Sequence, residues 1–255
     1  MNILFVGDVH TKLNIIDLVE QLLNNSSMKI DKVVFTGDYV DDWGCSIQDN
    51  INTIKYVISF KNRYKDKIIL LLGNHELSYL GHPCSGHKAS LELTNLLKIN
   101  IQYMDVFYNY RNILVSHGGL TENWKNLFEH KFGWQFPYTQ VNDALHSLDE
   151  NLLSYLAIAS YTSGGNGIYA SPLWARPKDH KLFLVNNLIQ VVGHTPIQGN
   201  ISDNIYKHCS SEIFYIDTFS TYNNETIGNK DLLYFDDETD TFINLLESND
   251  YKLNK

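Results

Sequence analysis

Short apolar runs alternate with longer amphipathic runs through the first third of the chain. Residues 3–6, 33–35 and 68–72 are apolar throughout, as expected for strands that are covered on both faces. Between these runs, apolar residues recur at intervals of three or four, at Leu13, Ile16, Val19, Leu22 and Leu23 and again at Ile51, Ile54, Val57 and Ile58. That spacing places each set on one helical face. The order of elements predicts a sheet whose strands are joined by crossover helices.

Five further strands are predicted in the rest of the chain, at residues 113–115, 191–192, 213–216, 232–235 and 242–245. The last two flank an acidic turn at residues 236–240, which predicts a hairpin.

The pattern loosens between about residues 121 and 188. This region contains the aromatic stretch KFGWQFPY, a helix-like run at residues 141–157 and a glycine-containing loop at residues 164–167. No linker composition borders it, so we interpret it as an elaboration on the substrate side of a single domain spanning residues 1–255. Its aromatic residues Trp134, Phe136 and Tyr138 are expected to pack in the core, with stacking against a base as the alternative.

Composition narrows the classes of partner. The formal net charge of −9 disfavours extended nucleic-acid binding and adhesion to anionic membranes, because phosphate groups are held mainly by Lys and Arg. No apolar run reaches the ~18 residues that span a bilayer, and the apolar start meets Asp8 too early for a signal peptide. We therefore expect a cytoplasmic protein with unpaired thiols at Cys45, Cys84 and Cys209. The abundance of Asn, Ile and Lys suggests a bacterial or phage-infected bacterial cell.

Residues of metal-ligating types follow five of the predicted strands. In chain order they occur in Gly7-Asp8-Val9-His10, Gly37-Asp38-Tyr39-Val40-Asp41, Gly73-Asn74-His75-Glu76, Ser116-His117-Gly118-Gly119 and Gly193-His194-Thr195-Pro196. Functional residues of open α/β sheets collect at the carboxyl ends of the strands, so we expect the five segments to meet at one edge. Asp8 and His10 should point to the same side of an extended turn. The glycines allow sharp turns and a close approach of the backbone to a ligand.

The chemistry of these side chains fits a pair of divalent ions. Carboxylates and imidazoles without thiolates suit manganese, iron and zinc, and they argue against a structural zinc site. In a dinuclear site one carboxylate bridges two ions that lie ~3.5–4 Å apart and clamp the attacking and leaving oxygens. We expect Asp38 to be this bridge. Turn chemistry explains glycines and aspartates, but it does not explain four histidines at successive strand ends.

The ordered set GDVH, GDYVD, GNHE, SHGG and GHTP resembles the calcineurin-like metallophosphoesterase superfamily. Within it, the set is most similar to the serine/threonine phosphoprotein phosphatases and their bacterial and phage relatives, which include symmetrical diadenosine tetraphosphate hydrolases. The resemblance covers residues 8 to about 218. It implies an α/β fold, a four-layer sandwich of two mixed β-sheets packed face to face and flanked by helices, with the metals at one edge.

The resemblance also implies a role for each motif residue. One ion would be held by Asp8, His10 and Asp38, and the other by Asp38, Asn74, His117 and His194. His75 would donate a proton to the leaving oxygen, and Asp41 would orient it, because a carboxylate favours the imidazolium form. The attacking species would be a metal-bridging hydroxide, with no covalent intermediate. The expected cofactors are two divalent ions, manganese first, with iron or zinc as alternatives.

The chain departs from the resemblance at several positions. The protein phosphatases continue GDYVD with a phosphate-binding arginine, whereas here Asp42 follows, and it would repel a dianion unless it is paired or turned away. Arg176, in the segment SPLWARP, is the substitute candidate for the phosphate clamp, with a surface ion pair or stem packing as the alternative. Phe219 replaces a usual glycine, which predicts a local change in the loop after residue 218. The segment 83–87 also departs from the eukaryotic phosphatases, and we expect it to line the substrate side.

Some polar residues of the motifs have simpler interpretations. Asp41 is a candidate turn cap, and Glu76 is expected to support the site or cap a turn rather than to bind a metal. The remaining histidines are expected to be exposed or hydrogen-bonded, with His87 the strongest exception because it lies just beyond the GNHE motif; they are His82, His87, His130, His146, His180 and His208.

Three hypotheses for function remain at this point. The first is a dinuclear-metal phosphomonoesterase or phosphoprotein phosphatase acting on a phosphorylated substrate. The second is a hydrolase of dinucleoside polyphosphates or another small nucleotide, which base stacking by the aromatics of residues 121–188 would favour. The third is a metal-free binding protein on the same fold. The presence of every expected ligand favours the enzymes over the third.

Overall fold

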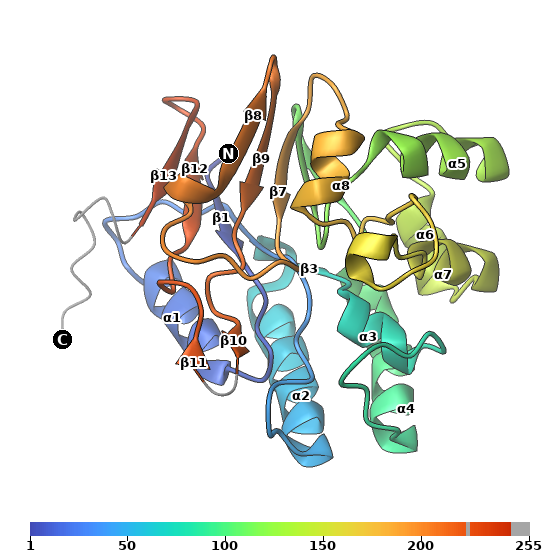
Figure 1. The fold of residues 1–255 in the computed structure, drawn as a ribbon. Helices are drawn as coiled ribbons and strands as arrows, with labels where there is room; N and C mark the ends of the chain where they lie inside the picture. The colour runs from blue at the N-terminus through green and yellow to red at the C-terminus, as the bar shows by residue number, and fades with distance from the viewer. Residues whose placement is uncertain (223–224, 246–255) are drawn as a thin grey trace.

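Two mixed β-sheets form the centre of the computed structural model, which describes residues 1–222 and 225–245 (Figure 1). The first sheet has six strands, in the order β13 (Thr241–Asn244), β12 (Leu233–Asp236), β1 (Ile3–Val6), β2 (Lys32–Phe35), β3 (Ile68–Leu71) and β4 (Met104–Asp105). Strands β1 to β4 are parallel, and β12 is antiparallel to both β1 and β13.

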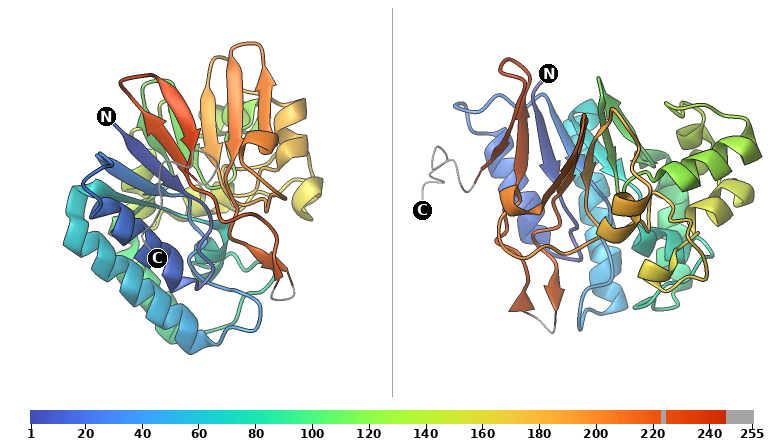
Figure 2. Two further views of the ribbon diagram at one scale, coloured as in Figure 1. Left: turned by 90° about the vertical axis from the view of Figure 1, so that its left-hand side faces the viewer. Right: turned by 45° about the horizontal axis from the view of Figure 1, so that its top comes forward.

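The second sheet has five strands, in the order β5 (Tyr108–Tyr110), β6 (Ile113–Ser116), β7 (Ile189–Val192), β9 (Ser211–Tyr215) and β8 (Ile205–His208). Its three central strands are parallel, and the edge strands β5 and β8 are antiparallel to their neighbours. A separate hairpin of β10 (Thr221–Tyr222) and β11 (Glu225–Thr226) projects beyond the sheets (Figure 2).

Eight α-helices flank the described part of the two sheets (Figure 1). Four belong to the first half of the chain, namely α1 (Leu13–Leu23), α2 (Ile47–Tyr64), α3 (Asn74–Tyr79) and α4 (Leu91–Asn100). The other four lie in the loosely patterned region, namely α5 (Glu122–Phe132), α6 (Val141–His146), α7 (Glu150–Leu156) and α8 (Pro177–Leu182). The prediction of two mixed sheets flanked by helices is therefore confirmed.

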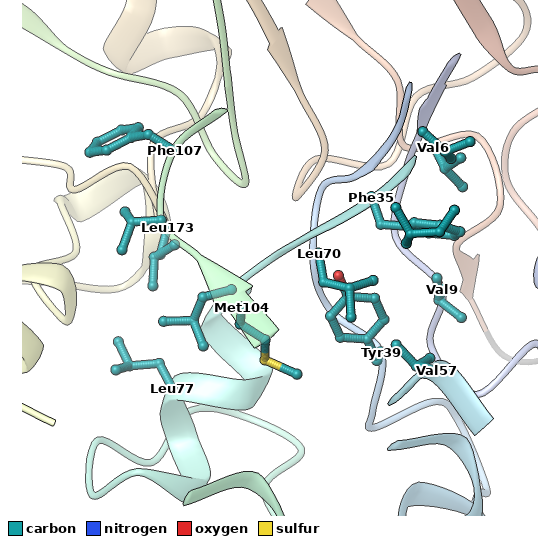
Figure 3. Close-up of a cluster of buried hydrophobic side chains, with 14 of the residues drawn as sticks. Val6, Val9, Phe35, Tyr39, Val57, Leu70, Leu77, Met104, Phe107 and Leu173 are labelled. Atoms are coloured by element: carbon teal, nitrogen blue, oxygen red, sulfur yellow. The ribbon is translucent and has the colours of Figure 1, made fainter. Parts of the chain in front are cut away.

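The alternation of side chains along the strands divides the core in two. On β1, Ile3 and Phe5 belong to a buried cluster that also holds Ile113 and Val115 of β6, so this cluster fills the space between the sheets. The intervening Leu4 and Val6 belong to the cluster that packs against the helices. Figure 3 shows part of that second cluster, where side chains from β1, β2 and β3 lie near those of α2 and of the loop after β2; the labelled examples are Val6, Phe35, Leu70, Val57 and Tyr39.

The patterned elements match their predictions, and the deviations have local causes. All eight predicted strands form, and β12 and β13 make the predicted hairpin. The helix predicted at residues 141–157 is instead two helices, α6 and α7. Leu148 has a left-handed backbone with φ of 55°, and the side chain of Asp149 caps the new helix by accepting a hydrogen bond from the Leu152 amide.

Candidate metal centre

The five predicted motifs meet at one edge of the sandwich, because each follows a parallel strand of one of the two sheets. Asp8 and His10 follow β1, Asp38 follows β2, and Asn74 opens α3 directly after β3. From the second sheet, His117 follows β6 and His194 follows β7. The carboxyl ends of these strands therefore face one another across the interface between the sheets.

The donor atoms of these side chains form two groups that share Asp38. In each group the donor atoms lie within 4.8 Å of one another: Asp8, His10 and Asp38 form one, and Asp38, His117 and His194 form the other. The Asp38 Oδ2 atom lies 3.3 Å from Nε2 of His117 and 3.8 Å from Nε2 of His10. Asn74 joins the second group, because its Oδ1 atom lies 2.8 Å from the same His117 nitrogen.

Backbone geometry brings these residues together, and it corrects the expectation of an extended turn at Asp8 to His10. His10, Asp38 and His194 all have left-handed backbones, with φ of 42°, 50° and 61°. This conformation is strained for residues with a Cβ atom, and such strain clusters at functional sites. Two positions require glycine because the backbone there lies very close to a ligand carboxylate. A Cβ atom on Gly73 would overlap the Asp38 carboxylate, and one on Gly193 would overlap the Asp8 carboxylate.

Glu76 holds the loop that carries Asp38. Its carboxylate is buried and accepts hydrogen bonds from the backbone amides of Gly73, Asp38 and Tyr39 at 3.0, 2.9 and 2.8 Å. It thereby ties the end of β2 to the end of β3. Glu76 is a structural support of the site, as its interpretation as a capping group predicts.

The electrostatics of the site fit a bound cation. Burial, reinforced by the charge of Asp217, raises the pKa of Asp8 well above its usual value. Burial also raises the pKa of Asp217 to about 6, and the charge of Asp38 adds to that effect. Burial lowers the pKa of His10 to about 4, which favours the neutral imidazole that a metal requires. Clustered carboxylates of this kind are costly to bury unless positive charge offsets their repulsion.

The environment of His194 also indicates that the site suits a metal ion. Its backbone amide donates to the Asp8 carboxylate at 3.1 Å, which fixes the residue beside the first ligand group. Its side-chain Nε2 atom is buried without a hydrogen-bond partner among the described residues. Buried polar atoms normally have a partner. A metal ion is a partner suited to an imidazole nitrogen beside carboxylate and amide oxygens.

His75 and Asp41 form a hydrogen-bonded pair at the same edge. Nδ1 of His75 lies 3.2 Å from Oδ2 of Asp41, and its Nε2 atom lies 4.0 Å from Oδ2 of Asp38. Burial alone would lower the pKa of His75, but the charge of Asp38 and the hydrogen bond to Asp41 raise it well above the usual value. Asp41 is fixed in turn by the Tyr79 hydroxyl at 2.7 Å and the Asn50 amide at 2.8 Å.

A cavity of about 530 Å³ opens over this cluster. It is lined by residues of both ligand groups, by His75 and Asp41, and by Arg176. Arg176 donates from Nε to the Ser163 hydroxyl at 3.0 Å, and no described carboxylate lies within ion-pair distance of its guanidinium. Cys84, Ser85 and Gly86 also line the cavity, which places part of the segment 83–87 there.

Comparison with known proteins decides the family. The family model described as calcineurin-like phosphoesterase matches residues 1–198. The chain belongs to this family. Calcineurin-like phosphoesterases are metal-dependent phosphoric ester hydrolases, so the chain falls in that class of enzyme.

Similarity to individual calcineurin-like phosphoesterases is more distant. A cold-active protein-tyrosine phosphatase from a psychrophilic Shewanella species is 18% identical, with a TM-score of 0.61 over 96% of this chain and 80% of that one. A further structure of a cold-active protein tyrosine phosphatase is also 18% identical, with a TM-score of 0.57 over 96% of this chain and 78% of that one. At this identity the likeness concerns the fold. The serine/threonine-protein phosphatase 4 catalytic subunit of Kluyveromyces lactis is 31% identical over 70 residues, which are 28% of this chain and only 21% of that relative.

Asp42, the residue that departs from the phosphatase motif, is paired. Its Oδ2 atom lies 2.7 Å from the Lys12 ammonium, and its Oδ1 atom accepts a hydrogen bond from the Thr221 hydroxyl at 2.9 Å. Burial raises the pKa of Asp42, but the contact with Lys12 and the other hydrogen bonds outweigh burial and hold this pKa below its usual value. The charge that would repel a phosphate is therefore neutralised by Lys12.

The aromatic residues singled out from sequence do not line the cavity. Tyr138 is buried in the core, and Trp134 and Phe136 are half-buried and pack against it with other rings of the region, in particular Phe128 and Phe132. Packing is therefore the correct interpretation, and base stacking by these three residues is wrong. Among the described residues, no helix is both long enough and apolar enough to cross a membrane.

Several cavity residues received no site role from the sequence, among them Trp43, Trp174, Asp217 and Tyr222. Asp217 had a usable signal, since it follows the predicted strand 213–216 as Asp8 and Asp38 follow theirs. Tyr222 lies three residues beyond Phe219, in the loop where a local change was predicted. Trp43 and Tyr222 could not be found from a sequence motif, because contacts between distant parts of the chain bring them to the cavity.

Proposed function

We propose that the chain is a dinuclear-metal phosphomonoesterase or phosphoprotein phosphatase. The observation that carries this proposal is the pair of ligand groups that share the Asp38 carboxylate. A shared carboxylate is what a two-ion site needs, and the described donors are of the types that manganese, iron and zinc accept. The cavity over the cluster supports the proposal, because it gives a phosphate ester access to the site where the ions would bind.

In this proposal Asp8, His10 and Asp38 would hold one ion, and Asp38, Asn74, His117 and His194 would hold the other. When bound, such ions supply positive charge to the phosphate and lower the pKa of coordinated water towards neutrality. We take manganese as the expected metal, with iron or zinc as alternatives. Glu76 keeps Asp38 in place through the backbone.

The chain's own residues supply the remaining parts of the reaction. Arg176 binds a phosphate oxygen, since its guanidinium reaches the cavity and, among the described residues, Ser163 engages only its Nε. His75 gives a proton from Nε2 to the leaving oxygen, while its Nδ1 donates a hydrogen bond to the Asp41 carboxylate, which holds the ring in place. The leaving oxygen would depart opposite an attacking water, and no covalent bond to the protein would form.

The alternative functions have less support. The second hypothesis, hydrolysis of dinucleoside polyphosphates, drew on base stacking by the aromatics of residues 121–188. Of these, Trp134, Phe136 and Tyr138 lie outside the cavity lining, and Trp174 lines the cavity. The third, a metal-free binding protein, does not account for two sets of buried donors sharing one carboxylate.

A substrate panel with manganese-loaded protein tests the proposal. The panel contains p-nitrophenyl phosphate, a phosphoserine peptide, a phosphotyrosine peptide, bis-p-nitrophenyl phosphate, a cyclic nucleotide and diadenosine tetraphosphate. We expect monoesters to be hydrolysed with the highest kcat/KM, and Asp38→Asn to abolish the activity. Preference for the tetraphosphate would favour the second hypothesis, and no turnover on any ester would favour the third.

A further inference from the structure

Two exposed aromatic side chains form one wall of the cavity over the metal centre. Trp43 lies in the loop after β2, and Tyr222 lies on β10, in the hairpin that projects beyond the sheets. Their rings meet edge to face, with centroids 5.3 Å apart and an interplanar angle of 76°. The residues remain 52% and 61% exposed, although large aromatic residues normally bury more of their surface.

The Asp42 carboxylate joins the two segments that carry these rings, through a contact between residues 179 positions apart in the sequence. Its Oδ1 atom accepts a hydrogen bond from the backbone amide of Trp43 at 2.8 Å and another from the Thr221 hydroxyl at 2.9 Å. Lys12 neutralises the same carboxylate through Oδ2. The Asp42 side chain thus contacts the backbone of Trp43 and the side chain of Thr221, the neighbour of Tyr222, and so links the segments that carry the two rings.

The wall and the His75 side chain line the same cavity. Trp43 follows Asp41 by two residues, and Asp41 is the direct partner of His75. His75 is the proton donor to the leaving oxygen in the proposed function, on which this step rests. A group attached to that oxygen would therefore lie in the cavity that Trp43 and Tyr222 also line.

We propose that Trp43 and Tyr222 form a subsite for a planar aromatic ring carried by the leaving group of the phosphate ester. An edge-to-face pair leaves ring surface free for a third ring, and aromatic stacking is favourable for any planar ring. The polar groups next to the wall are already engaged: Asp42 by Lys12, and the Lys88 ammonium by the backbone oxygen and the thiol of Cys45. The wall therefore offers stacking beside polar groups that already have hydrogen-bond partners.

Two matched pairs of monoesters test the subsite and identify the source of the ring. Benzyl phosphate and ethyl phosphate both release a simple alcohol, so their comparison separates recognition of the ring from acidity of the leaving group. AMP and ribose 5-phosphate differ only in the nucleobase. For each pair, the ratio of kcat/KM with and without the ring is measured for the manganese-loaded wild type and for each variant.

We expect Trp43→Ala and Tyr222→Ala each to lower the ratio for at least one pair roughly tenfold, and Trp43→Phe to retain most of it. A fall on the benzyl pair assigns a benzyl or phenol-type ring, and a fall on the AMP pair assigns a nucleobase. Tyr161→Ala is the matched control, because Tyr161 is 62% exposed and lies outside the cavity lining. Equal losses on both members of each pair, or no change in either ratio, would overturn the subsite.

A binding measurement separates this inference from the proposed function. Phenylphosphonate and methylphosphonate cannot be hydrolysed, and their affinities for the wild type follow from quenching of Trp43 fluorescence, with Trp43→Phe as the reference. We expect phenylphosphonate to bind roughly tenfold more tightly. Equal affinities overturn the subsite even if every ester is hydrolysed, whereas no ester hydrolysis with a retained preference refutes the proposed function alone.

Discussion

The Asp41 carboxylate lies 3.2 Å from Nδ1 of His75, while the other ring nitrogen of His75 lies 4.0 Å from the shared ligand Asp38. The His75 imidazole thus lies between the Asp41 carboxylate and the metal centre. Because Tyr79 and Asn50 both donate to Asp41, the orientation of the ring is set by a network and not by one contact.

For His75→Ala we predict a loss of about 10²- to 10⁴-fold in kcat on a phosphoserine peptide, the range for a missing general acid. The loss on p-nitrophenyl phosphate should be smaller, because p-nitrophenolate leaves without protonation. Manganese content, measured by elemental analysis, should stay at the wild-type level. Equal losses of kcat on the two substrates would contradict the role of His75 as an acid.

Asp41→Asn should have a milder effect than His75→Ala, because it keeps the size of the side chain and a hydrogen-bonding group near Nδ1. We predict a loss of about tenfold or more in kcat on the phosphoserine peptide, with little change in KM, since the ring loses its anionic partner. Steady-state kinetics on the same two substrates measures it. A loss confined to KM would place Asp41 in substrate binding instead.

Arg176→Ala should raise KM by about 10- to 100-fold with a smaller change in kcat, because a charged contact to phosphate is removed. Arg176→Lys should recover only part of the loss, because lysine lacks the planar fork of the guanidinium. Arg63→Ala is the control, since Arg63 pairs with Glu20 on the surface at 2.8 Å. Wild-type kinetics for Arg176→Ala would contradict phosphate binding by Arg176 and would leave it a structural role.

Glu76→Gln should destabilise the protein, since the amide group keeps only one acceptor oxygen for the backbone amides that the two carboxylate oxygens now accept. We predict a loss of about 2–4 kcal/mol in the free energy of unfolding, measured in urea. Glu92→Gln is the control, because the Glu92 side chain is 67% exposed and its pairing with Lys55 is at the distance limit of 4.0 Å. Wild-type stability of Glu76→Gln would show that the buried carboxylate is dispensable.

Because of the buried His180 side chain, we expect the stability of the protein to depend on pH even without metal. Burial lowers the pKa of its imidazole from 6.5 to about 4, and its Nδ1 atom lies 2.9 Å from the Tyr215 hydroxyl. Between these pKa values the unfolded chain binds a proton that the folded chain does not, so stability falls as the pH decreases through this window. The loss from this group between about pH 7 and about pH 5 should be about 2 kcal/mol.

The measurement for His180 is urea unfolding at these two pH values in the presence of EDTA, so that release of metal does not contribute. His180→Gln should lose less stability on acidification than the wild type, whatever its stability at neutral pH. His130→Gln, a change at an exposed position, should keep the wild-type dependence. The same loss for His180→Gln and the wild type would contradict the assignment.

The convergence of the ligands was predictable because it depends on a simple geometric rule. Asp8 and Asp38 each follow an apolar run that could only be a covered strand, and parallel strands end at one edge of a sheet. The short strands β4 and β5, of two and three residues, are too brief to carry a periodic pattern. The break between α6 and α7 was missed because apolar residues continue across Leu148, whose left-handed backbone ends the first helix.

Contacts between distant segments could not be predicted from local pattern. The pairing of Trp43 with Tyr222 depends on the Asp42 contact to Thr221, and the interpretation of Asp42 itself changes once Lys12 is found beside it. The assignment of residues 1–255 to a single domain and the cytoplasmic location stay predictions.

The central claim is that one carboxylate, Asp38, joins two sets of donors around two metal ions. Crystals grown with manganese and measured near the manganese absorption edge test it directly. We predict two anomalous peaks per chain, both within coordination distance of Asp38, and their loss in Asp38→Asn. A single peak, or peaks that lie away from Asp38, would contradict the account.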